Sequence, residues 1–396
     1  MRIEWSKRPK FNIPQGYYVH PSRRITLNAG DESRPEIRNL PKTVHGGQAW
    51  RLKGIEDYSH NLNPFGPPGC IAEIASGAVK HSDHYPDDSS IGFRTAVASQ
   101  FNVSPDNVIA GSGSSDIIRM FPNTFLSPGD KVVMFRPSFA EYTQQCRIVG
   151  AHIDYIPLRP ENDYRIDIRE LENHLTDDVR ALYICNPNNP TGRVESREKI
   201  LGIIDMCQHK DIYVFLDETL LELVDGYGDI SCASYVNEYD NLIVAGSLTK
   251  SFAIPGIRIG FGITSKPIAD EMNKVRMTWN IGIVEQTVGE ELISKHMDYV
   301  HDASKVLKEE SRYMYSELKR IGFPVSAPAD SFFYFCDLTS IGFDSKSFTD
   351  AMLARGIMVR DCNSFGPEYS GCVRFCVKDR EHDDRFIAAV KKVMER

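Results

Sequence analysis

Residues 182–192 read LYICNPNNPTG, an apolar run followed at once by a turn rich in asparagine, proline and glycine. The run Leu182–Cys185 has the length and apolar character of a buried strand. Proline and glycine then form a rigid turn at the carboxyl end of that strand, which is where ligand sites lie in α/β proteins. A purely structural turn is the alternative, but a run as particular as Asn186–Gly192 favours a ligand site.

Strands and helices alternate on both sides of this stretch, from about residue 90 onward. Longer amphipathic segments such as Arg197–His209 lie between several short apolar runs. Further buried strands are predicted at Val132–Phe135, Ile212–Leu216, Leu242–Ala245 and Ile259–Ile263. Apolar strands separated by helices are typical of a mainly parallel sheet covered on both faces. The predicted fold class is therefore α/β.

A chain of 396 residues is long enough for two lobes. We expect an N-terminal arm and part of a small domain at 1–80, a large domain at 81–282 and a small C-terminal domain at 283–396. The arm proper, 1–44, shows little periodicity. The small domain should be α+β, because its sequence predicts strands and one final helix, at Ser331–Cys336, Cys372–Val377 and Asp383–Met394.

Composition and charge exclude several classes of protein. The net charge of −8, without a basic run, argues against a nucleic-acid partner. No apolar stretch approaches the ~18 residues that a membrane span needs, and the N-terminus lacks the apolar region of a secretory signal. Nine cysteines without a CxxC pair argue against a metal site or disulfide framework. A cytoplasmic protein is expected.

The segment Ser247-Leu-Thr-Lys250 follows the predicted strand Leu242–Ala245, and Arg258 comes shortly after it. A lysine directly behind a buried strand is an unusual place for a solvated charge. Desolvation lowers the pKa of such an amine and makes it a usable nucleophile. A single lysine is nearly always a surface residue, so the spacing of hydroxyl, lysine and arginine carries the signal.

Two further features are weak by themselves. Gly111-Ser-Gly-Ser-Ser-Asp116 precedes the apolar helix Ile117–Phe125, an arrangement that can bind an anion or simply cap a helix. Asp217 closes the predicted strand Ile212–Leu216. A buried carboxylate is costly unless it meets a cation or a donor, but an ordinary helix cap or surface residue is the alternative.

Taken in order, Asn186–Gly192, Asp217-Glu218 and Ser-x-x-Lys250-(x)7-Arg258 resemble the class I/II aminotransferases of pyridoxal-phosphate (PLP) fold type I. The resemblance extends from about residue 45 to the C-terminus. It implies an aspartate-aminotransferase-like fold, with a large mainly parallel sheet of the seven-stranded type and a smaller α+β lobe. It also implies PLP as cofactor and a homodimer.

The resemblance implies a role for each matching residue. Lys250 carries the cofactor as a Schiff base, Asp217 pairs with the pyridine nitrogen, and Asn189 donates to the ring oxygen O3′. Tyr142 stacks on the ring, and Tyr85 reaches the phosphate from the neighbouring subunit. The residues implied to hold the phosphate are Gly113, Ser114, Ser115, Ser247 and Arg258. One departure is Leu220, where many relatives place an aromatic that donates to O3′.

Finer features concern the substrate. His45-Gly-Gly47, Asn61-Leu-Asn63 and Arg360-Asp-Cys-Asn-Ser-Phe365 resemble the threonine-phosphate decarboxylases of cobalamin biosynthesis. The closest neighbours of that group are the histidinol-phosphate aminotransferases. Both act on a phosphorylated amino acid or amino alcohol. The substrate contacts implied are His45, Asn63, Asn189, Arg360 and Arg374, with Arg374 clamping the carboxylate.

The sequence therefore predicts PLP-dependent decarboxylation of L-threonine O-3-phosphate to (R)-1-aminopropan-2-yl phosphate. A histidinol-phosphate-type aminotransferase is the alternative, and a catalytically inert PLP-binding homologue is the second alternative. The bond that stands perpendicular to the cofactor ring is the one that breaks. Motifs do not fix that rotation, so both reactions stay open at this point.

Overall fold

The computed structural model describes residues 33–38, 40–41 and 51–395. The chain divides into two compact units, Met1–Asn39 and Leu40–Arg396. In the first unit the described element is the short helix α2 (Pro35–Arg38). Most of the predicted arm 1–44 lies outside the described residues, and so does His45. The elements below all belong to the second unit.

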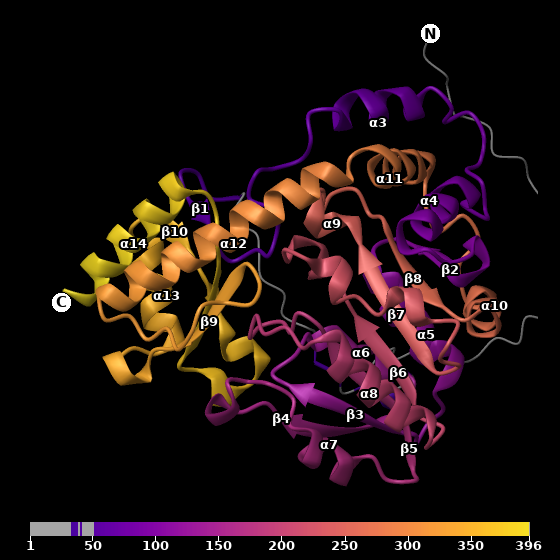
Figure 1. The fold of residues 1–396 in the computed structure, drawn as a ribbon, viewed down its shortest axis with the longest axis horizontal. Helices are drawn as coiled ribbons and strands as arrows, with labels where there is room; N and C mark the ends of the chain where they lie inside the picture. Colours follow the sequence, from indigo (N-terminus) through magenta and orange to yellow (C-terminus); the bar gives the residue numbers. More distant parts are fainter. Residues whose placement is uncertain (1–32, 39, 42–50, 396) are drawn as a thin grey trace, which may run out of the picture. The chain divides into compact units, whose positions relative to one another are not determined.

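A seven-stranded sheet forms the centre of the large lobe, in the order β2-β8-β7-β6-β5-β3-β4 (Figure 1). Its strands are β2 (Val108–Gly111), β3 (Lys131–Arg136), β4 (His152–Pro157), β5 (Val179–Cys185), β6 (Tyr213–Asp217), β7 (Leu242–Ser247) and β8 (Gly260–Thr264). Strand β8 is antiparallel to both its neighbours, and the other pairs are parallel. The predicted mainly parallel sheet is confirmed, and each strand predicted in this lobe overlaps an observed one.

Each face of the sheet is covered by helices. Alternate side chains of a strand point to opposite faces, so in β3 Val132 and Met134 join one apolar core while Val133 and Phe135 join the other. The first core includes α5 (Ser114–Phe125), α6 (Ala140–Ile148) and α10 (Lys266–Lys274). The second includes α4 (Ile91–Phe101), α7 (Ile168–His174) and α8 (Arg197–Gln208).

The small lobe is α+β, as predicted. A three-stranded antiparallel sheet has the order β11-β12-β9, from Arg360–Asp361, Cys372–Cys376 and Phe333–Asp337. The N-terminal strand β1 (Glu56–Asp57) pairs in parallel with β10 (Ile357–Met358). Helices α13 (Ser345–Leu353) and α14 (Arg380–Met394) complete it.

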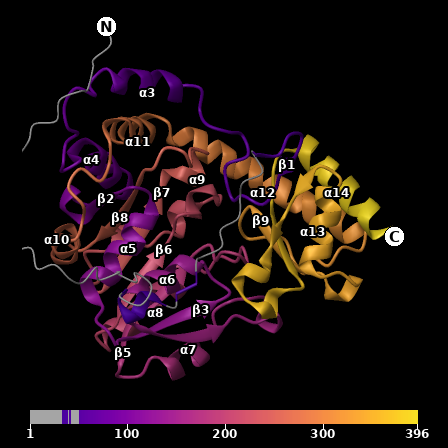
Figure 2. The same ribbon diagram turned by 180° about the vertical axis from the view of Figure 1, so that it is seen from behind.

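Two helices follow the predicted domain boundary after residue 282. Helix α11 (Ile283–Lys295) packs on α3 (Ile71–Val79) and α4, so it belongs with the large lobe. Helix α12 (Met297–Arg320) then runs into the small lobe, as the reverse view in Figure 2 shows. The predicted boundary at 282/283 therefore falls one helix too early.

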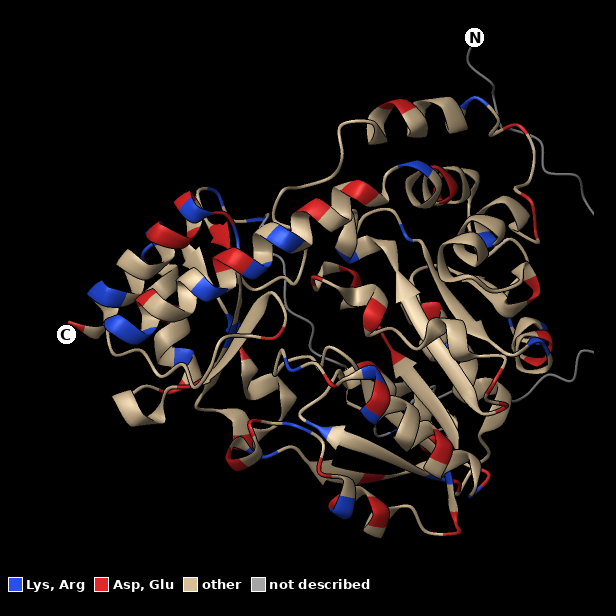
Figure 3. Ribbon diagram, viewed as in Figure 1, with Lys and Arg blue, Asp and Glu red and all other residues tan. Residues whose placement is uncertain are grey.

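Acidic and basic residues are mixed along the outer helices α12 and α14 (Figure 3). Pairs such as Arg320–Glu317 and Arg385–Glu381 lie within one helix at the surface, where ion pairs contribute little to stability. In the part of the chain that the structure describes, no helix is both long and apolar enough to span a membrane. The same residues contain no group of three or more metal-binding side chains.

Candidate active site

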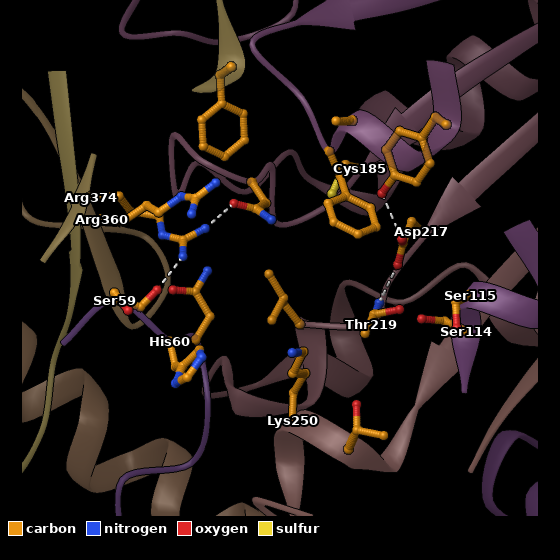
Figure 4. Close-up of a pocket in the computed structure, with 18 of the residues that line it drawn as sticks. Ser59, His60, Ser114, Ser115, Cys185, Asp217, Thr219, Lys250, Arg360 and Arg374 are labelled. Carbon is orange, nitrogen blue, oxygen red and sulfur yellow. Dashed lines mark hydrogen bonds between the residues drawn. The ribbon is translucent and has the colours of Figure 1, made fainter. Parts of the chain in front are cut away.

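A cavity of about 280 Å³ lies at the carboxyl ends of β5, β6 and β7, with walls from both lobes. Figure 4 shows Arg360 and Arg374 on one wall and Asp217 and Thr219 on the opposite wall, with Lys250 between them. Most of the residues predicted from the sequence line this cavity. They are Ser114, Ser115, Tyr142, Asn189, Asp217, Lys250, Arg258, Arg360 and Arg374.

Lys250 lies in the short helix α9 (Leu248–Ser251), which begins directly after β7. Burial lowers the pKa of Lys250 to about 8, and the positive charges of Arg374 and Arg258 act in the same direction. An amine with this pKa is largely neutral in mildly alkaline solution. The amine can therefore act both as a nucleophile and as a proton carrier.

Asp217 ends β6 and is buried. Its Oδ2 accepts a hydrogen bond from the hydroxyl of Tyr142 at 2.6 Å, and its Oδ1 accepts one from the backbone N–H of Thr219 at 2.9 Å. Burial raises the pKa of Asp217 above the usual value. A cationic group in the cavity would lower that pKa again and would be held by the carboxylate.

Tyr142 does not occupy the position predicted for it. Its hydroxyl is bonded to Asp217, and its ring packs in the core 5.5 Å from that of Tyr183 and 6.3 Å from that of Phe215. Phe139, one helical turn earlier, also lines the cavity and meets Tyr142 edge to face. We therefore propose that Phe139 stacks on the cofactor ring and that Tyr142 orients Asp217.

The amino end of α5 forms a cup for an anion. Gly113 precedes the helix with φ of 78°, and Arg258 Nη2 donates to Ser115 Oγ at 3.3 Å. A Cβ on Gly113 would lie 2.5 Å from Arg258 Nη2, and one on Gly260 would lie 2.6 Å from the Ser114 nitrogen. Both glycines are needed for this close approach, and helix N-termini favour phosphate groups.

Ser247 was expected to contact the cofactor phosphate, but it caps α9 instead. Its hydroxyl lies 2.9 Å from Thr249 Oγ1 and donates to the carbonyl of Ile259 at 3.3 Å. Ser247 is 1% exposed, and Thr249 is the hydroxyl residue of α9 that lines the cavity. The sequence motif fixed the position of this serine in the chain but not the direction of its side chain.

Asn63 was expected to contact substrate, and it too has a structural role. Its Nδ2 donates to the carbonyl of Ser251 at 2.8 Å, and its Oδ1 accepts from the N–H of Phe65. The backbone N–H of Asn63 donates to the carbonyl of Lys250 at 2.9 Å. Residues 59–63, which we call the crossing segment, are thereby fastened to the helix that carries the lysine. Within this segment it is Asn61 that lines the cavity.

Two arginines supply the positive wall. Arg374 in β12 donates to Asn189 Oδ1 and to the carbonyl of Ser59, both at 2.5 Å, and burial lowers its pKa to about 10. Arg360 lies opposite it in the register of β11 and β12 and donates to Ser364 Oγ at 2.7 Å. Two guanidinium groups in one cavity suit a ligand with two anionic groups.

The residues present fit PLP. The α5 cup suits its phosphate, Phe139 its ring, Asp217 its pyridine nitrogen and Lys250 its aldehyde. Thr219 Oγ1 is buried without a partner among the described residues, as expected of a cavity that closes around a polar ligand. Leu220 lines the cavity but offers no donor to O3′. The Nδ2 of Asn189 is the donor predicted for that oxygen.

Tyr85 is separate from the cavity of its own chain. It is 70% exposed and stacks on Trp279 with ring centroids 4.0 Å apart. His45 lies outside the described residues. The sequence interpretation missed His60, which lines the cavity. The available signal was its place three residues after Asp57, at the start of the segment that leads to Asn63.

Comparison with known proteins places the site in a family. The profile of the family described as aminotransferase class I and II matches residues 57–390. A histidinol-phosphate aminotransferase of Moorella thermoacetica is 26% identical, over 94% of this chain and 98% of that protein. A histidinol-phosphate aminotransferase of Ruminiclostridium cellulolyticum is 30% identical, over 88% of this chain and 94% of that protein. The structure of a histidinol-phosphate aminotransferase from Clostridium acetobutylicum matches with a TM-score of 0.78 and 27% identity, over 86% and 99% of the two chains.

Proposed function

Because the chain belongs to the class I and II aminotransferases, a PLP-dependent family, we propose that it transfers an amino group between a phosphorylated amine and a 2-oxo acid. Histidinol phosphate is the proposed amino donor and 2-oxoglutarate the acceptor. The observation that carries this proposal is Lys250, a half-buried amine whose pKa desolvation lowers to about 8, facing the same cavity as Asp217 and Arg374. The names of the relatives support the choice of donor.

PLP, when bound, supplies an electron sink that stabilises negative charge on the reacting carbon of the substrate. Asp217, oriented by Tyr142 and Thr219, keeps a positive charge on the pyridine nitrogen. The neutral amine of Lys250 takes the proton from the reacting carbon and can return it. Transamination needs this proton transfer, whereas decarboxylation would leave the same hydrogen in place.

The two arginines explain how one cavity takes two substrates in turn. Arg374 holds the carboxylate of the oxo acid next to the reacting carbon, with its fork already fixed by Asn189 and Ser59. Arg360, beside Ser364, holds the group at the far end. That group is the phosphate of the amine in one half of the reaction and the second carboxylate of 2-oxoglutarate in the other.

The proposal includes a homodimer. Tyr85 and Trp279 form a stacked pair that is exposed in the single chain, at 70% and 45%. Neighbouring apolar side chains such as Ile91 and Met277 are also exposed. Exposed apolar groups of this kind mark interaction surfaces. Tyr85, which is predicted to reach the cofactor phosphate of the neighbouring subunit, is therefore available for that contact.

Decarboxylation of threonine phosphate, the first expectation from the sequence, stays as the second proposal. Its specific support is the pair Arg360 and Arg374, since that substrate carries a phosphate and a carboxylate at once. The names of the relatives favour transamination. The charge of the cavity suits both substrates, so an experiment has to distinguish the two reactions.

The test is to incubate the PLP-loaded enzyme with histidinol phosphate and 2-oxoglutarate, and separately with labelled threonine phosphate. Stoichiometric glutamate from the first mixture, with no carbon dioxide from the second, is the expected result. Carbon dioxide from threonine phosphate without glutamate formation would move the assignment to the decarboxylase. No turnover of either substrate would overturn both proposals.

A further inference from the structure

His60 lies on the wall of the cavity, in the crossing segment just after β1. Its Nδ1 is 2.8 Å from Asp57 Oδ2. The other oxygen of Asp57 accepts from the N–H of Ser59 at 2.7 Å and from its hydroxyl at 2.6 Å. Asp57 accepts all three contacts, so the ring nitrogen facing it carries the hydrogen. The second nitrogen, Nε2, has no partner among the described residues.

Asp57 is well suited to hold this ring. It sits in β1, which is paired with β10, and its side chain is 19% exposed. Although burial opposes ionisation, hydrogen bonds from His60 and Ser59 keep the pKa of Asp57 below its usual value. The carboxylate therefore stays charged and fixes the direction of the ring. In the doubly protonated ring, which a carboxylate on one side and an anionic ligand on the other both favour, Nε2 is a donor as well.

The neighbouring residue, Asn61, gives an independent sign of a ligand at this wall. Asn61 is 6% exposed and lines the cavity. Neither its Oδ1 nor its Nδ2 has a partner among the described residues. Buried amides nearly always find partners, so a polar group from a ligand is the natural one here. The two side chains come from consecutive residues and face the same cavity.

The charges on this wall specify the ligand. Figure 4 shows His60 and Ser59 on the same side of the cavity as Arg360 and Arg374. A third nitrogen donor next to two guanidinium groups suits a dianion better than a single carboxylate. A phosphate monoester meets this requirement, because it carries close to two charges and three acceptor oxygens near neutral pH.

We infer that His60, held by Asp57 and assisted by Asn61, binds the phosphate ester of the substrate and so determines specificity for phosphorylated amines. This inference rests on the proposed function and deepens it, since it assigns the recognition of phosphate to a residue outside the predicted set. His45, which the sequence also predicts as a substrate contact, lies outside the described residues, and its role stays a prediction.

The test compares histidinol phosphate with histidinol in the wild type and in His60→Ala. Binding is followed through the visible absorbance of the bound cofactor, without a 2-oxo acid. Loss of one charge-assisted hydrogen bond should weaken binding of the phosphorylated compound by roughly tenfold or more. Binding of histidinol and the affinity for PLP should change by less than about twofold, since neither uses this contact.

Two further variants separate a direct contact from a structural effect. Asp57→Asn should reduce the same preference partially, because the ring keeps a polar neighbour but loses the negative charge that favours its doubly protonated, donating form. His209→Ala serves as the control, since that histidine, directly after the last residue of α8, has a side chain that is 75% exposed. A His60→Ala enzyme that keeps the full preference for the phosphorylated compound overturns the inference alone. A wild type without any such preference overturns the inference and the proposed substrate class together.

Discussion

Lys250 combines two properties that rarely occur together, a basic side chain and a half-buried, largely desolvated place in the wall of a cavity. Its pKa falls from 10.5 to about 8, so the neutral, reactive amine predominates above that pH and not only above 10.5. Below the pKa, each unit of pH should change the neutral fraction about tenfold. This shift gives a prediction for the enzyme without its cofactor.

The rate at which the cofactor-free enzyme couples to PLP should rise with pH and level off near pH 8. The measurement is the appearance of the visible band after mixing at a series of pH values. Borohydride reduction and peptide mapping should then place the label on Lys250. Levelling off only near pH 10.5, or a label on another lysine, would contradict the role given to this residue.

A single substitution distinguishes the roles proposed for Tyr142 and Phe139. Tyr142→Phe keeps an aromatic ring but removes the donor that lies 2.6 Å from Asp217. A stacking residue would tolerate that change, whereas a residue that orients Asp217 would not. We expect PLP affinity to fall by roughly tenfold, the cost of one hydrogen bond to a buried charge. Equilibrium dialysis measures it, and unchanged affinity would return the stacking role to Tyr142.

Sequence patterns located the reactive residues better than they located side-chain directions. Lys250 and Asp217 were identified because Lys250 follows an apolar strand and Asp217 ends one. A charge at such a place is costly to bury unless it has a partner or a ligand. Ser247 and Asn63 matched motifs equally well, yet both bond to their own protein. His60 belongs to the stretch 57–68, which matched the family, but no role was assigned to it, since its place in the cavity depends on the pairing of β1 with β10. Such long-range contacts leave no local pattern.

At the scale of the element, the amino end of α5 has little room for an added atom. A Cβ on Gly113 would meet Arg258 Nη2 at 2.5 Å, and φ at this residue is 78°. Gly113→Ala should therefore displace the guanidinium and weaken PLP binding by roughly tenfold or more. The measurement is the dissociation constant of PLP from the refolded apoenzyme.

Gly129→Ala provides the matched control. Gly129 also has positive φ, 95°, but a Cβ there meets nothing within 4 Å. Both variants carry the backbone cost of a non-glycine residue at positive φ, of about 1–3 kcal/mol. Only Gly113→Ala should lose cofactor affinity. Equal losses in the two variants would mean that general destabilisation, and not the cup, is responsible.

Elements could be predicted where the apolar pattern was strong. Strands β6 and β7 are buried along their whole length or nearly so, and their sequences showed it. Strands β2 and β4 were missed for different reasons. Strand β2 has only four residues, while β4 lies at the sheet edge with exposed ends at His152 and Pro157. Helix α11 was assigned to the wrong lobe because its partners α3 and α4 lie about 200 residues earlier.

At the scale of the whole molecule, the proposed dimer makes a prediction about mixed subunits. If Tyr85 serves the neighbouring site, a Tyr85→Phe subunit paired with a Lys250→Ala subunit has one complete site. That site combines Lys250 of the first chain with Tyr85 of the second. Each variant alone should have low activity, and mixing after dissociation should recover up to about a quarter of the wild-type value.

The measurement is specific activity after mixing, with sedimentation to determine the assembly. Mixing Lys250→Ala subunits with themselves is the control, because no combination of those chains restores an amine. A fully active monomer would contradict the proposed dimer. A dimer without recovery would show that Tyr85 acts within its own chain.

The crossing segment has a consequence for the order in which the newly made chain matures. Ser59 accepts from Arg374, and Asn63 from the same segment donates to the carbonyl of Ser251, partners 315 and 188 residues further along. A ribosome delivers the amino end first, so residues 59–63 must wait until nearly the whole polypeptide has emerged. A nascent chain that stops before β12 thus contains Lys250 but has no closed chamber around it. We therefore expect cofactor capture to be a late event in biosynthesis, which follows the docking of the crossing segment on β12.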